Sequence, residues 1–236
     1  NSLVLQDIAA DGRVLVTHGQ MRSEVRGRLA GDTEERDLSW LDGTILPKLS
    51  PDGTKMVFEE WGEGGGFLAS TYLLRTDGSS PVRLGSGEPL DVSPDWTRVV
   101  ARAGFRYPDN GLQLIPIGAG EPVPLPRGTI RDFMWAYWHP AGDRLLILGS
   151  EENQPVRVFV QDLPDGLPRP MLPDPDARLG TRVIAPDGKW FLTRGDGGSS
   201  WVLRAFDGPE TVPVPGLDPE DRPCGWSADG RYMFLV

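Results

Sequence analysis

Serine, glycine and histidine are the residues whose spacing would reveal a catalytic site, and in this sequence their spacing does not fit one. Neither Gly85-Ser86-Gly87 nor Gly197-Gly198-Ser199 has the G-x-S-x-G spacing that exposes a nucleophilic serine on a sharp turn. The segment 62–66 begins like the phosphate-binding pattern G-x-G-x-x-G, but Phe67 stands where the last glycine is needed. We therefore expect no catalytic residues and no enzymatic activity in this chain.

Candidate metal ligands are also sparse. The two histidines, His18 and His139, do not form the H-E-x-x-H pair of a zinc site. The single Cys224 excludes a disulfide within the chain and any site built from several cysteines. The acidic segment 173–176 lacks the D-x-[DN]-x-[DN]-G order of a calcium loop, so we interpret it as a proline-stiffened connection. We expect no metal and no cofactor, and a buried position for Cys224.

A recurring turn sequence sets the elements that must position any functional residue. Its clearest copy is Ser50-Pro51-Asp52-Gly53, in which proline presets φ, serine and aspartate bond to nearby backbone, and glycine supplies the left-handed residue. Apolar residues on both sides indicate two antiparallel strands, so the unit is a β-hairpin. Six copies end at residues 12, 53, 96, 142, 188 and 230, with spacings of 41 to 46 residues. A period in this range is typical of a β-propeller.

A second turn lies inside each complete repeat, 19 to 25 residues after the first. Two hairpin turns per period imply four antiparallel strands, which make one propeller blade. We predict an all-β fold, a β-propeller of five complete four-stranded antiparallel blades and a partial sixth, in one domain over residues 1–236. The blades are expected at about 3–41, 45–86, 88–127, 129–173 and 176–215, with only a hairpin at 222–236.

Two repeats contain residues that do not suit their expected positions. In the first blade Arg22, Arg26 and Arg28 interrupt the apolar pattern of the third strand, which predicts a weak, exposed outer strand. In the third repeat Trp96 stands where the turn glycine is expected. Either that turn changes its type or a bulky residue takes a positive φ.

The segment 133–138 is rich in aromatic residues and is predicted to be a buried strand at the start of the fourth blade. Side chains alternate between the two faces of a strand. This alternation predicts one face with Phe133, Trp135 and Tyr137 and the other with Met134, Ala136 and Trp138.

The sixth repeat contains one hairpin only. A two-stranded piece is marginally stable in water, and the strand at 232–236 would have an unpaired apolar edge. We expect the chain to be a piece of a longer protein. The edge would then be paired with further strands of that protein or with a second copy of the chain.

Composition excludes two classes of partner. The formal net charge is −10, and lysine and arginine are scattered among more numerous carboxylates, so nucleic acid is excluded as the main partner. No apolar run approaches the roughly 20 residues that span a bilayer, so we expect no membrane insertion by this segment. No secretory signal sequence is visible.

Over almost its whole length the chain resembles the TolB-type, WD-repeat-like family of bacterial β-propellers. The resemblance is carried by the repeated S-P-D-G turn, the strand that follows it and the second D-G turn. It implies that the strand before each S-P-D-G turn is the innermost of its blade and lines a central channel. It also implies that both hairpin turns of a blade share one face, which leaves the other face to variable loops.

A narrower likeness is carried by the segments 35–42, 62–66, 74–79, 118–122 and 225–231. They look like the propeller region that follows the kinase domain in some bacterial receptor-like serine/threonine protein kinases. In that family a membrane helix usually follows the kinase, and the propeller faces outward as a sensor. The likeness implies an extracytoplasmic location, on the periplasmic side, and no activity, because this chain has no kinase motifs.

The face with the variable loops is where the resemblance places contacts with a protein, peptide or small-molecule ligand. Aromatic residues and arginine are favoured at such contacts. The candidates, each with a core position as the alternative, are Trp40, Trp61, Phe105, Arg106, Tyr107 and Trp135.

The leading hypothesis is a non-catalytic sensor or scaffold propeller of a receptor-like kinase. Two alternatives stay open. One is a TolB-like periplasmic assembly protein, and the other is a propeller that gates an α/β-hydrolase peptidase domain outside this chain.

Overall fold

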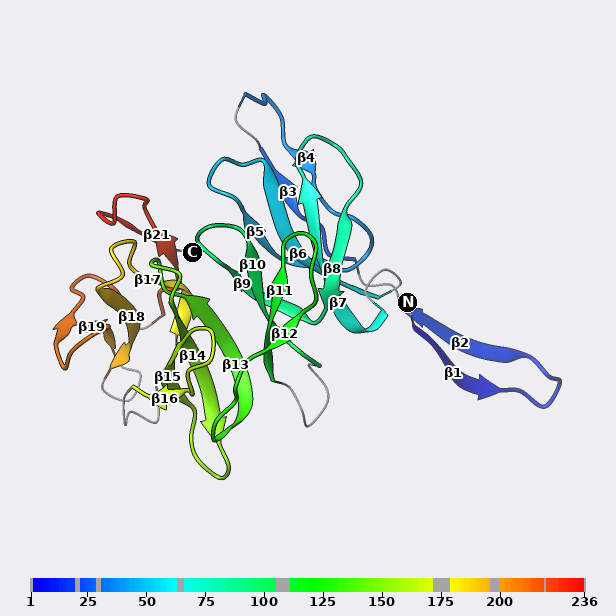
Figure 1. Cartoon of the computed structure of the whole chain (residues 1–236). Helices are drawn as coiled ribbons and strands as arrows, with labels where there is room; N and C mark the ends of the chain where they lie inside the picture. Colours follow the sequence, from blue (N-terminus) through cyan, green and yellow to red (C-terminus); the bar gives the residue numbers. More distant parts are fainter. Residues whose placement is uncertain are drawn as a thin grey trace. The chain divides into compact units, whose positions relative to one another are not determined.

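The computed structural model consists of β-strands, turns and loops (Figure 1). It describes residues 2–19, 22–28, 31–62, 66–104, 111–171, 179–195, 200–218 and 220–235, and no helix occurs within these ranges. The chain divides into two compact units, Asn1–Pro89 and Leu90–Val236.

The first unit contains one four-stranded antiparallel sheet and two smaller pairs of strands. The sheet has the order β5 (Thr44–Leu49), β6 (Lys55–Gly62), β7 (Gly66–Arg75) and β8 (Val82–Ser86). The pairs are β1 (Ser2–Ile8) with β2 (Val14–Gly19), and β3 (Arg26–Gly27) with β4 (Arg36–Asp37). The sheet β5–β8 is the four-stranded antiparallel sheet that the segment 45–86 contains.

The first predicted blade, 3–41, differs from the expectation. Among the described residues its four strands form two separate pairs instead of one sheet. The cause lies in β3 and β4, which are two residues long because charged side chains interrupt the apolar pattern there, so they offer few hydrogen bonds to a neighbour. The hairpin β1–β2 consequently leaves seven large apolar side chains exposed, namely Leu3, Val4, Leu5, Ile8, Val14, Leu15 and Val16.

The second unit contains three four-stranded antiparallel sheets and a final hairpin. The first sheet has β9 (Glu88–Val92), which begins at the unit boundary, β10 (Arg98–Arg102), β11 (Leu112–Pro116) and β12 (Val123–Pro124). The second has β13 (Ile130–Trp138), β14 (Arg144–Glu151), β15 (Arg157–Asp162) and β16 (Arg169–Pro170). The third has β17 (Leu179–Ile184), β18 (Trp190–Gly195), β19 (Ser200–Ala205) and β20 (Thr211–Pro213). The hairpin is β21 (Pro223–Trp226) with β22 (Met233–Leu235). The segments 88–127, 129–173 and 176–215 thus each contain one four-stranded sheet, and 222–236 contains a hairpin.

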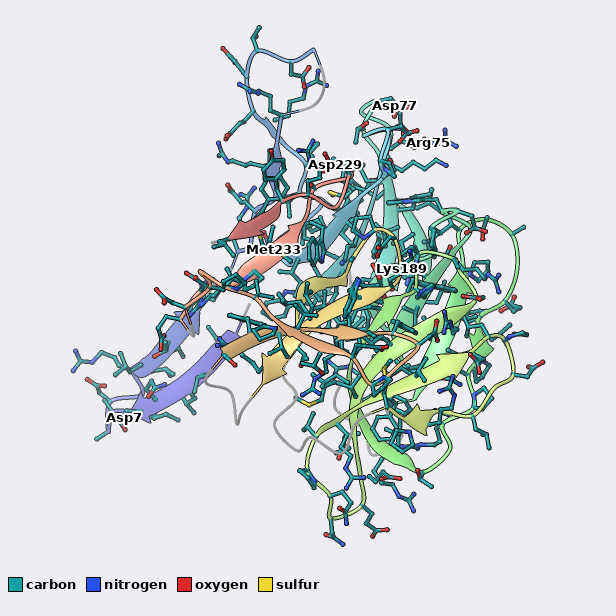
Figure 2. All side chains as sticks on the ribbon, turned by 90° about the vertical axis from the view of Figure 1, so that its left-hand side faces the viewer. Asp7, Arg75, Asp77, Lys189, Asp229 and Met233 are labelled. Carbon is teal, nitrogen blue, oxygen red and sulfur yellow. The ribbon has the colours of Figure 1, made fainter. Side chains whose placement is uncertain are left out.

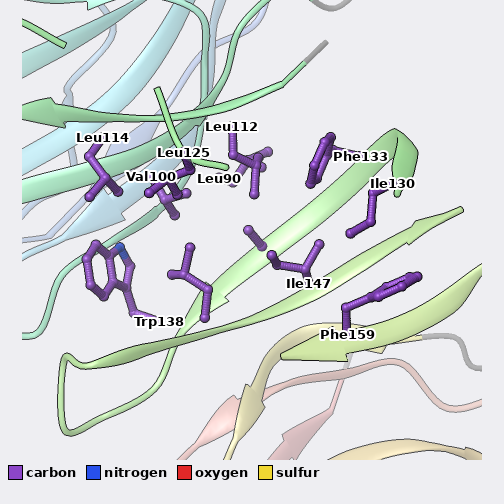
Figure 3. Close-up of a cluster of buried hydrophobic side chains, with 12 residues drawn as sticks. Leu90, Val100, Leu112, Leu114, Leu125, Ile130, Phe133, Trp138, Ile147 and Phe159 are labelled. Carbon is purple, nitrogen blue, oxygen red and sulfur yellow. The ribbon is translucent and has the colours of Figure 1, made fainter. Parts of the chain in front are cut away.

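The sheet β13–β16 is covered on both faces because its apolar side chains alternate. Leu145 and Ile147 of β14 pack toward the sheet β9–β12, whereas Leu146 between them packs toward β17–β20. Burying each such side chain contributes about 1.5–3 kcal/mol. The first of these two clusters is drawn in Figure 3. Its members are Leu90, Val100, Leu112, Leu114, Leu125, Ile130, Phe133, Ala136, Trp138, Leu145, Ile147 and Phe159.

The side-chain faces predicted for β13 are wrong at its beginning. Phe133 packs in the same cluster as Ala136 and Trp138, although alternation placed it on the opposite face. The register between β13 and β14 shifts between Phe133 and Trp135, which is a β-bulge. A bulge adds one residue to a strand and so reverses the side-chain faces on one side of it. Tyr137 lies in the other cluster, opposite Trp138, as predicted.

The recurring turn is held by a serine and an aspartate. Ser50 Oγ donates to Asp52 Oδ1 at 2.6 Å and accepts from Lys55 N at 2.9 Å. Asp52 Oδ1 also accepts from Thr54 N at 3.0 Å. The same serine-to-aspartate bond, again 2.6 Å, recurs in the third repeat and in the sixth. Figure 2 shows the aspartate of the sixth turn, Asp229, before β22.

Trp96 resolves the alternative left open for the third turn. Its backbone N donates to Ser93 O at 2.8 Å, as Gly53 N does to Ser50 O in the second repeat, so the turn keeps its hydrogen bond. The second alternative therefore holds: Trp96 takes a positive φ of 56°, close to the 70° of Gly53 at the same position of the second turn. A bulky residue therefore bears the strain of the left-handed region.

Successive turns of the second unit lie against each other. A Cβ added to Gly230 would come 3.6 Å from Pro186 Cδ, in the turn of the preceding repeat. At Gly188 the approach is closer, because His139 Nε2 lies 3.0 Å from the Gly188 carbonyl oxygen. A Cβ added to Gly142 of the fourth turn would likewise lie 3.9 Å from Pro94 Cδ of the third turn.

Replacing Trp96 by glycine and by alanine should separate backbone strain from side-chain packing. Both variants lose the indole, but only glycine adopts a φ near 56° without a Cβ penalty. We expect Trp96→Gly to be more stable than Trp96→Ala by about 1 kcal/mol in urea denaturation. Ala141→Gly, at a turn position without positive φ, should be destabilising. Equal stability of the two Trp96 variants would contradict the strain.

The turn aspartate of the second repeat should stay ionised to low pH. The hydroxyl of Ser50, and after it the amide of Thr54, lowers the pKa of Asp52 from 3.8 to about 2. Because this pKa is depressed in the folded state, the stabilisation is complete above a pH of about 4 and is lost as the pH falls to about 2. NMR titration of the carboxyl group should give a higher pKa in Ser50→Ala, with Ser80→Ala as the exposed control. An unchanged pKa in Ser50→Ala would show that the hydroxyl is not the cause.

Candidate functional site

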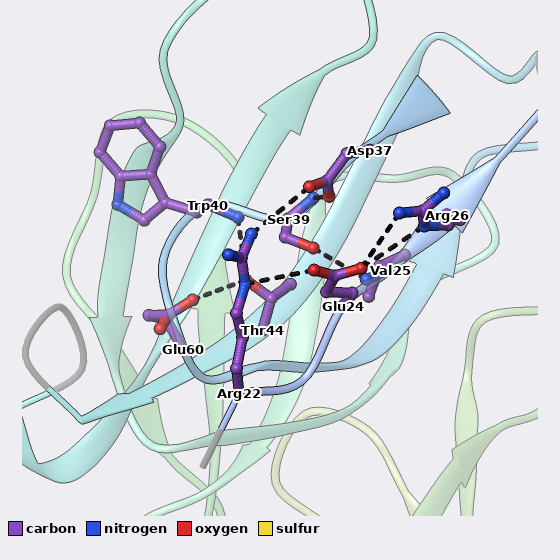
Figure 4. Close-up of polar contacts among 9 residues, drawn as sticks. All are labelled: Arg22, Glu24, Val25, Arg26, Asp37, Ser39, Trp40, Thr44 and Glu60. Atoms are coloured by element: carbon purple, nitrogen blue, oxygen red, sulfur yellow. Dashed lines mark hydrogen bonds and ion pairs between the residues drawn. The ribbon is translucent and has the colours of Figure 1, made fainter. Parts of the chain in front are cut away.

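The loop between β4 and β5 is anchored to the sheet of the first unit by a buried carboxylate. Glu60 of β6 is fully buried and accepts two hydrogen bonds, from Gly43 N at 2.8 Å and from Thr44 Oγ1 at 2.7 Å. Thr44 Oγ1 accepts in turn from Trp40 N at 2.9 Å, as Figure 4 shows. The backbone of this loop, and with it Trp40, is therefore fixed to β6.

A second set of polar contacts holds the other side of the same loop (Figure 4). Ser39 Oγ accepts from Val25 N at 2.8 Å, and Asp37 Oδ1 accepts from Ser39 N at 2.9 Å. The Ser39 hydroxyl, more than the nearby Arg22, lowers the pKa of Asp37. Arg22 lies 3.6 Å from Asp37 and 3.3 Å from Glu24, so this segment is an ionic network at the surface.

Trp40 and Trp61 are the two predicted contact residues that the structure brings to one loop. The Trp40 side chain is 41% exposed, whereas Trp61 at the end of β6 is half-buried. Trp61 N donates to Gly43 O at 3.3 Å, and a Cβ on Gly43 would lie 2.1 Å from Trp61 O. Only glycine fits there. The loop therefore leaves the Trp40 side chain exposed, while its backbone at Gly43 packs against the backbone of Trp61.

The remaining predicted contact residues are not part of this loop. Trp135 lies in the second unit, is half-buried and packs against both clusters of β13–β16, with its ring centroid 6.2 Å from that of Tyr137. Phe105, Arg106 and Tyr107 lie outside the described residues.

A pocket that the sequence did not predict lies in the second unit, where the strands β9, β13, β17 and β21 end. Each of these strands is at one edge of its sheet and directly precedes the recurring turn. The cavity has a volume of about 230 Å³ and is partly open to solvent. We call it the inner-strand pocket. It is lined by Asp91, Tyr137, Trp138, Pro140, Val183, Ile184, Pro186 and Trp226.

Hydrogen bonds between neighbouring strands fix the polar groups of the inner-strand pocket. Asp91 Oδ2 accepts from Trp138 N at 2.9 Å, which joins β9 to β13. Trp226 Nε1 donates to Val183 O at 3.4 Å, which joins β21 to β17. Burial first, and the Asp91 carboxylate second, raise the pKa of Tyr137, so its phenol stays neutral.

The chemistry of the inner-strand pocket suits binding. Its described lining offers one carboxylate, one phenol and two indoles, without a serine, cysteine, lysine or histidine that would form a nucleophile and base. The sequence did contain a signal for it. Aligned on their turns, Asp91, Tyr137 and Val183 share the position two residues before the turn, and the family resemblance already implied that this strand lines a channel.

The described part of the chain has neither a metal-binding cluster nor a membrane-spanning helix. It contains no group of three or more histidine, cysteine, aspartate or glutamate side chains placed to hold a metal ion. It also contains no helix of the length and apolarity needed to cross a membrane.

Comparison by sequence finds no relative, since no protein-family model and no curated protein matches this chain. Comparison by structure finds many similar proteins. A candidate TolB of Agrobacterium tumefaciens is 18% identical with a TM-score of 0.67, over 98% of this chain and 88% of that chain. TolB from Acinetobacter baumannii is 16% identical with a TM-score of 0.61, over 77% of this chain and 46% of that one. A prolyl endopeptidase structure is 16% identical with a TM-score of 0.60, over 91% of this chain and 36% of that one.

These structural neighbours are TolB-like β-propellers. The aligned region covers less than half of the Acinetobacter protein and little more than a third of the prolyl endopeptidase. At such low identity the likeness establishes the fold alone. The likeness confirms one part of the family resemblance, the TolB-like propeller fold that the repeats had predicted.

Replacing Glu60 by glutamine should destabilise the loop that carries Trp40. One carboxylate oxygen becomes an NH₂ group, which donates instead of accepting. It either faces the donor Gly43 N, or donates to Thr44 Oγ1, whose own hydroxyl hydrogen then loses its acceptor. An unsatisfied buried group of this kind costs about 1–3 kcal/mol. Urea denaturation should show this loss for Glu60→Gln and none for Glu121→Gln, at an exposed position. Equal stability of both variants would mean that Glu60 does not anchor the loop.

Proposed function

We propose that this chain is a non-catalytic binding module: a single-domain β-propeller that holds a protein, peptide or small-molecule ligand. The strand pairs within 3–41 are its incomplete first blade and the final hairpin is its partial sixth. The observation that supports binding is the inner-strand pocket. Four successive edge strands, far apart in sequence, converge there with aromatic side chains and one carboxylate. Concave sites with a mostly apolar lining and a few polar groups are where proteins bind small ligands.

The biological setting proposed for the module is a sensor. The segments 35–42 and 225–231 carry the likeness to the propeller region of bacterial receptor-like serine/threonine kinases. In that setting the module faces the periplasmic side, and ligand occupancy is relayed to a kinase domain elsewhere in the protein. A TolB-like assembly role places the same module at a protein partner instead.

A second candidate function is favoured by one of the structural comparisons. The fold matches a prolyl endopeptidase over 91% of this chain but only 36% of that chain. A propeller of a peptidase whose catalytic domain lies outside this segment would have the same fold and the same lack of catalytic residues. A nucleophile-elbow sequence in the same gene product distinguishes it from the kinase setting.

The edge of the final hairpin is proposed as a site of strand pairing. Tyr232, Phe234 and Leu235 are 63%, 55% and 45% exposed. In the other sheets of the second unit the strand after the recurring turn pairs on both sides. Further strands of a longer protein, or a second copy, would supply the missing partner for β22.

The binding proposal is tested by ligand-observed NMR with a library of amino acids, dipeptides, sugars and nucleosides. We expect at least one compound to bind, and we expect Trp226→Ala to abolish its signal while Trp40→Ala preserves it. The reverse result would place the ligand at the loop of Trp40 and overturn the pocket as the site. Binding by no compound in the library would overturn binding of these four ligand classes.

A further inference from the structure

We propose that the inner-strand pocket binds a cationic amine, either a primary ammonium group or a methylated one. The inference rests on the binding function proposed above and specifies its ligand. Three aromatic side chains, Tyr137, Trp138 and Trp226, and the carboxylate of Asp91 line one cavity. These are the two kinds of group that attract a positive charge in a partly apolar site.

The aromatic side chains of the inner-strand pocket are largely shielded from water. Tyr137 and Trp138 are each only 5% exposed, and Trp226 is half-buried. A cation near an aromatic face gains more when water is excluded, up to 2 kcal/mol or more compared with about 0.5–1 kcal/mol at exposed sites. An ammonium group that carries methyl or methylene groups would also contact the aliphatic wall of Val183 and Ile184.

The position of the carboxylate is fixed by the fold. Asp91 comes from β9, and the hydrogen bond from Trp138 N to Oδ2 holds it against β13. The described lining contains no lysine, arginine or histidine to repel a cation. The net charge of −10 acts in the same direction, because it raises the local concentration of cations around the protein.

Size and polarity disfavour other ligand classes. At about 230 Å³ the cavity is smaller than the roughly 300–1,000 Å³ typical of drug-sized ligands, so it suits one side chain or one head group. An anion would face Asp91. A sugar needs several hydrogen-bond partners, but the lining from Pro140, Val183, Ile184 and Pro186 provides no polar side chain.

The test compares cations with neutral molecules of the same shape. The probes are butylammonium with 1-butanol, and choline with 3,3-dimethyl-1-butanol, each titrated into the isotopically labelled chain and followed by amide chemical shifts. We expect at least one cation to bind about tenfold tighter than its neutral partner, with shifts around residues 91, 137–138 and 226. Which of the two cations does so distinguishes a primary amine from a methylated one.

A matched pair of variants tests the role of the carboxylate. Asp91→Asn removes the charge but keeps an oxygen that accepts from Trp138 N, so the strand contact is retained. It should weaken binding of the cation about tenfold and leave the neutral partner unaffected. Asp132→Asn makes the same change in net charge at an exposed position of β13 and should have no effect. If both variants lost the same affinity for the cation, the effect would come from the net charge of the protein and not from Asp91 in the pocket, which would overturn the proposal.

Failure of the amine proposal can be told apart from failure of the binding function. If neither cation binds tighter than its neutral partner while a library compound still shifts the amides of the inner-strand pocket, the amine proposal is wrong and the binding function stands. If neither the four probes nor any library compound shifts those amides, both are wrong. Thermal unfolding of each variant confirms that any lost binding does not come from lost folding.

Discussion

The backbone hydrogen bond from the amide of the fourth turn residue to the carbonyl of the first recurs in all six copies, and it is the interaction on which this architecture depends. In the second repeat it joins Gly53 to Ser50, and the Ser50 hydroxyl supports it by donating to Asp52. The same serine oxygen accepts from the amide of Lys55, where the next strand begins, so the closed turn sets where pairing starts. Because the strands on either side of each turn must pair in a fixed register to put their apolar residues inward, a local bond of this kind determines what each sheet can pack against.

Packing then extends the local order along the chain. Leu146 faces one neighbouring sheet and Leu145 the other, so the sheet β13–β16 is stable only between two others. The inner-strand pocket arises from the same arrangement, since strands that each begin a new sheet bring their last residues together. Its polar bonds, Asp91 to Trp138 and Val183 to Trp226, run between sheets. Binding chemistry and sheet-to-sheet contact therefore use the same residues.

The sequence predicted those features that a short stretch of residues decides. Turn residues and alternating apolar residues are local, which is why four of the five segments predicted as blades contain a four-stranded sheet and the last segment contains a hairpin. The bulge between Phe133 and Trp135 was missed because an inserted residue has no signature in alternation alone. In the first blade the sequence predicted a weak third strand at Arg26, but not that the pair β3–β4 would be separate from the hairpin β1–β2. The pocket was missed because Asp91 and Trp226 are 135 positions apart: the repeats align the strands that carry them, but only the fold shows that both side chains line one cavity.

The contacts between successive turns explain an asymmetry in the repeats. Gly188 lies against His139, and Gly230 against Pro186, so a longer turn would collide with its neighbour. The turn stays four residues long in all six copies, whereas the repeat length varies from 41 to 46 residues. The connections at the opposite ends of the strands differ in length instead, from three residues between β6 and β7 to nine between β10 and β11. Changes at those ends can alter recognition while the stacked turns preserve the scaffold.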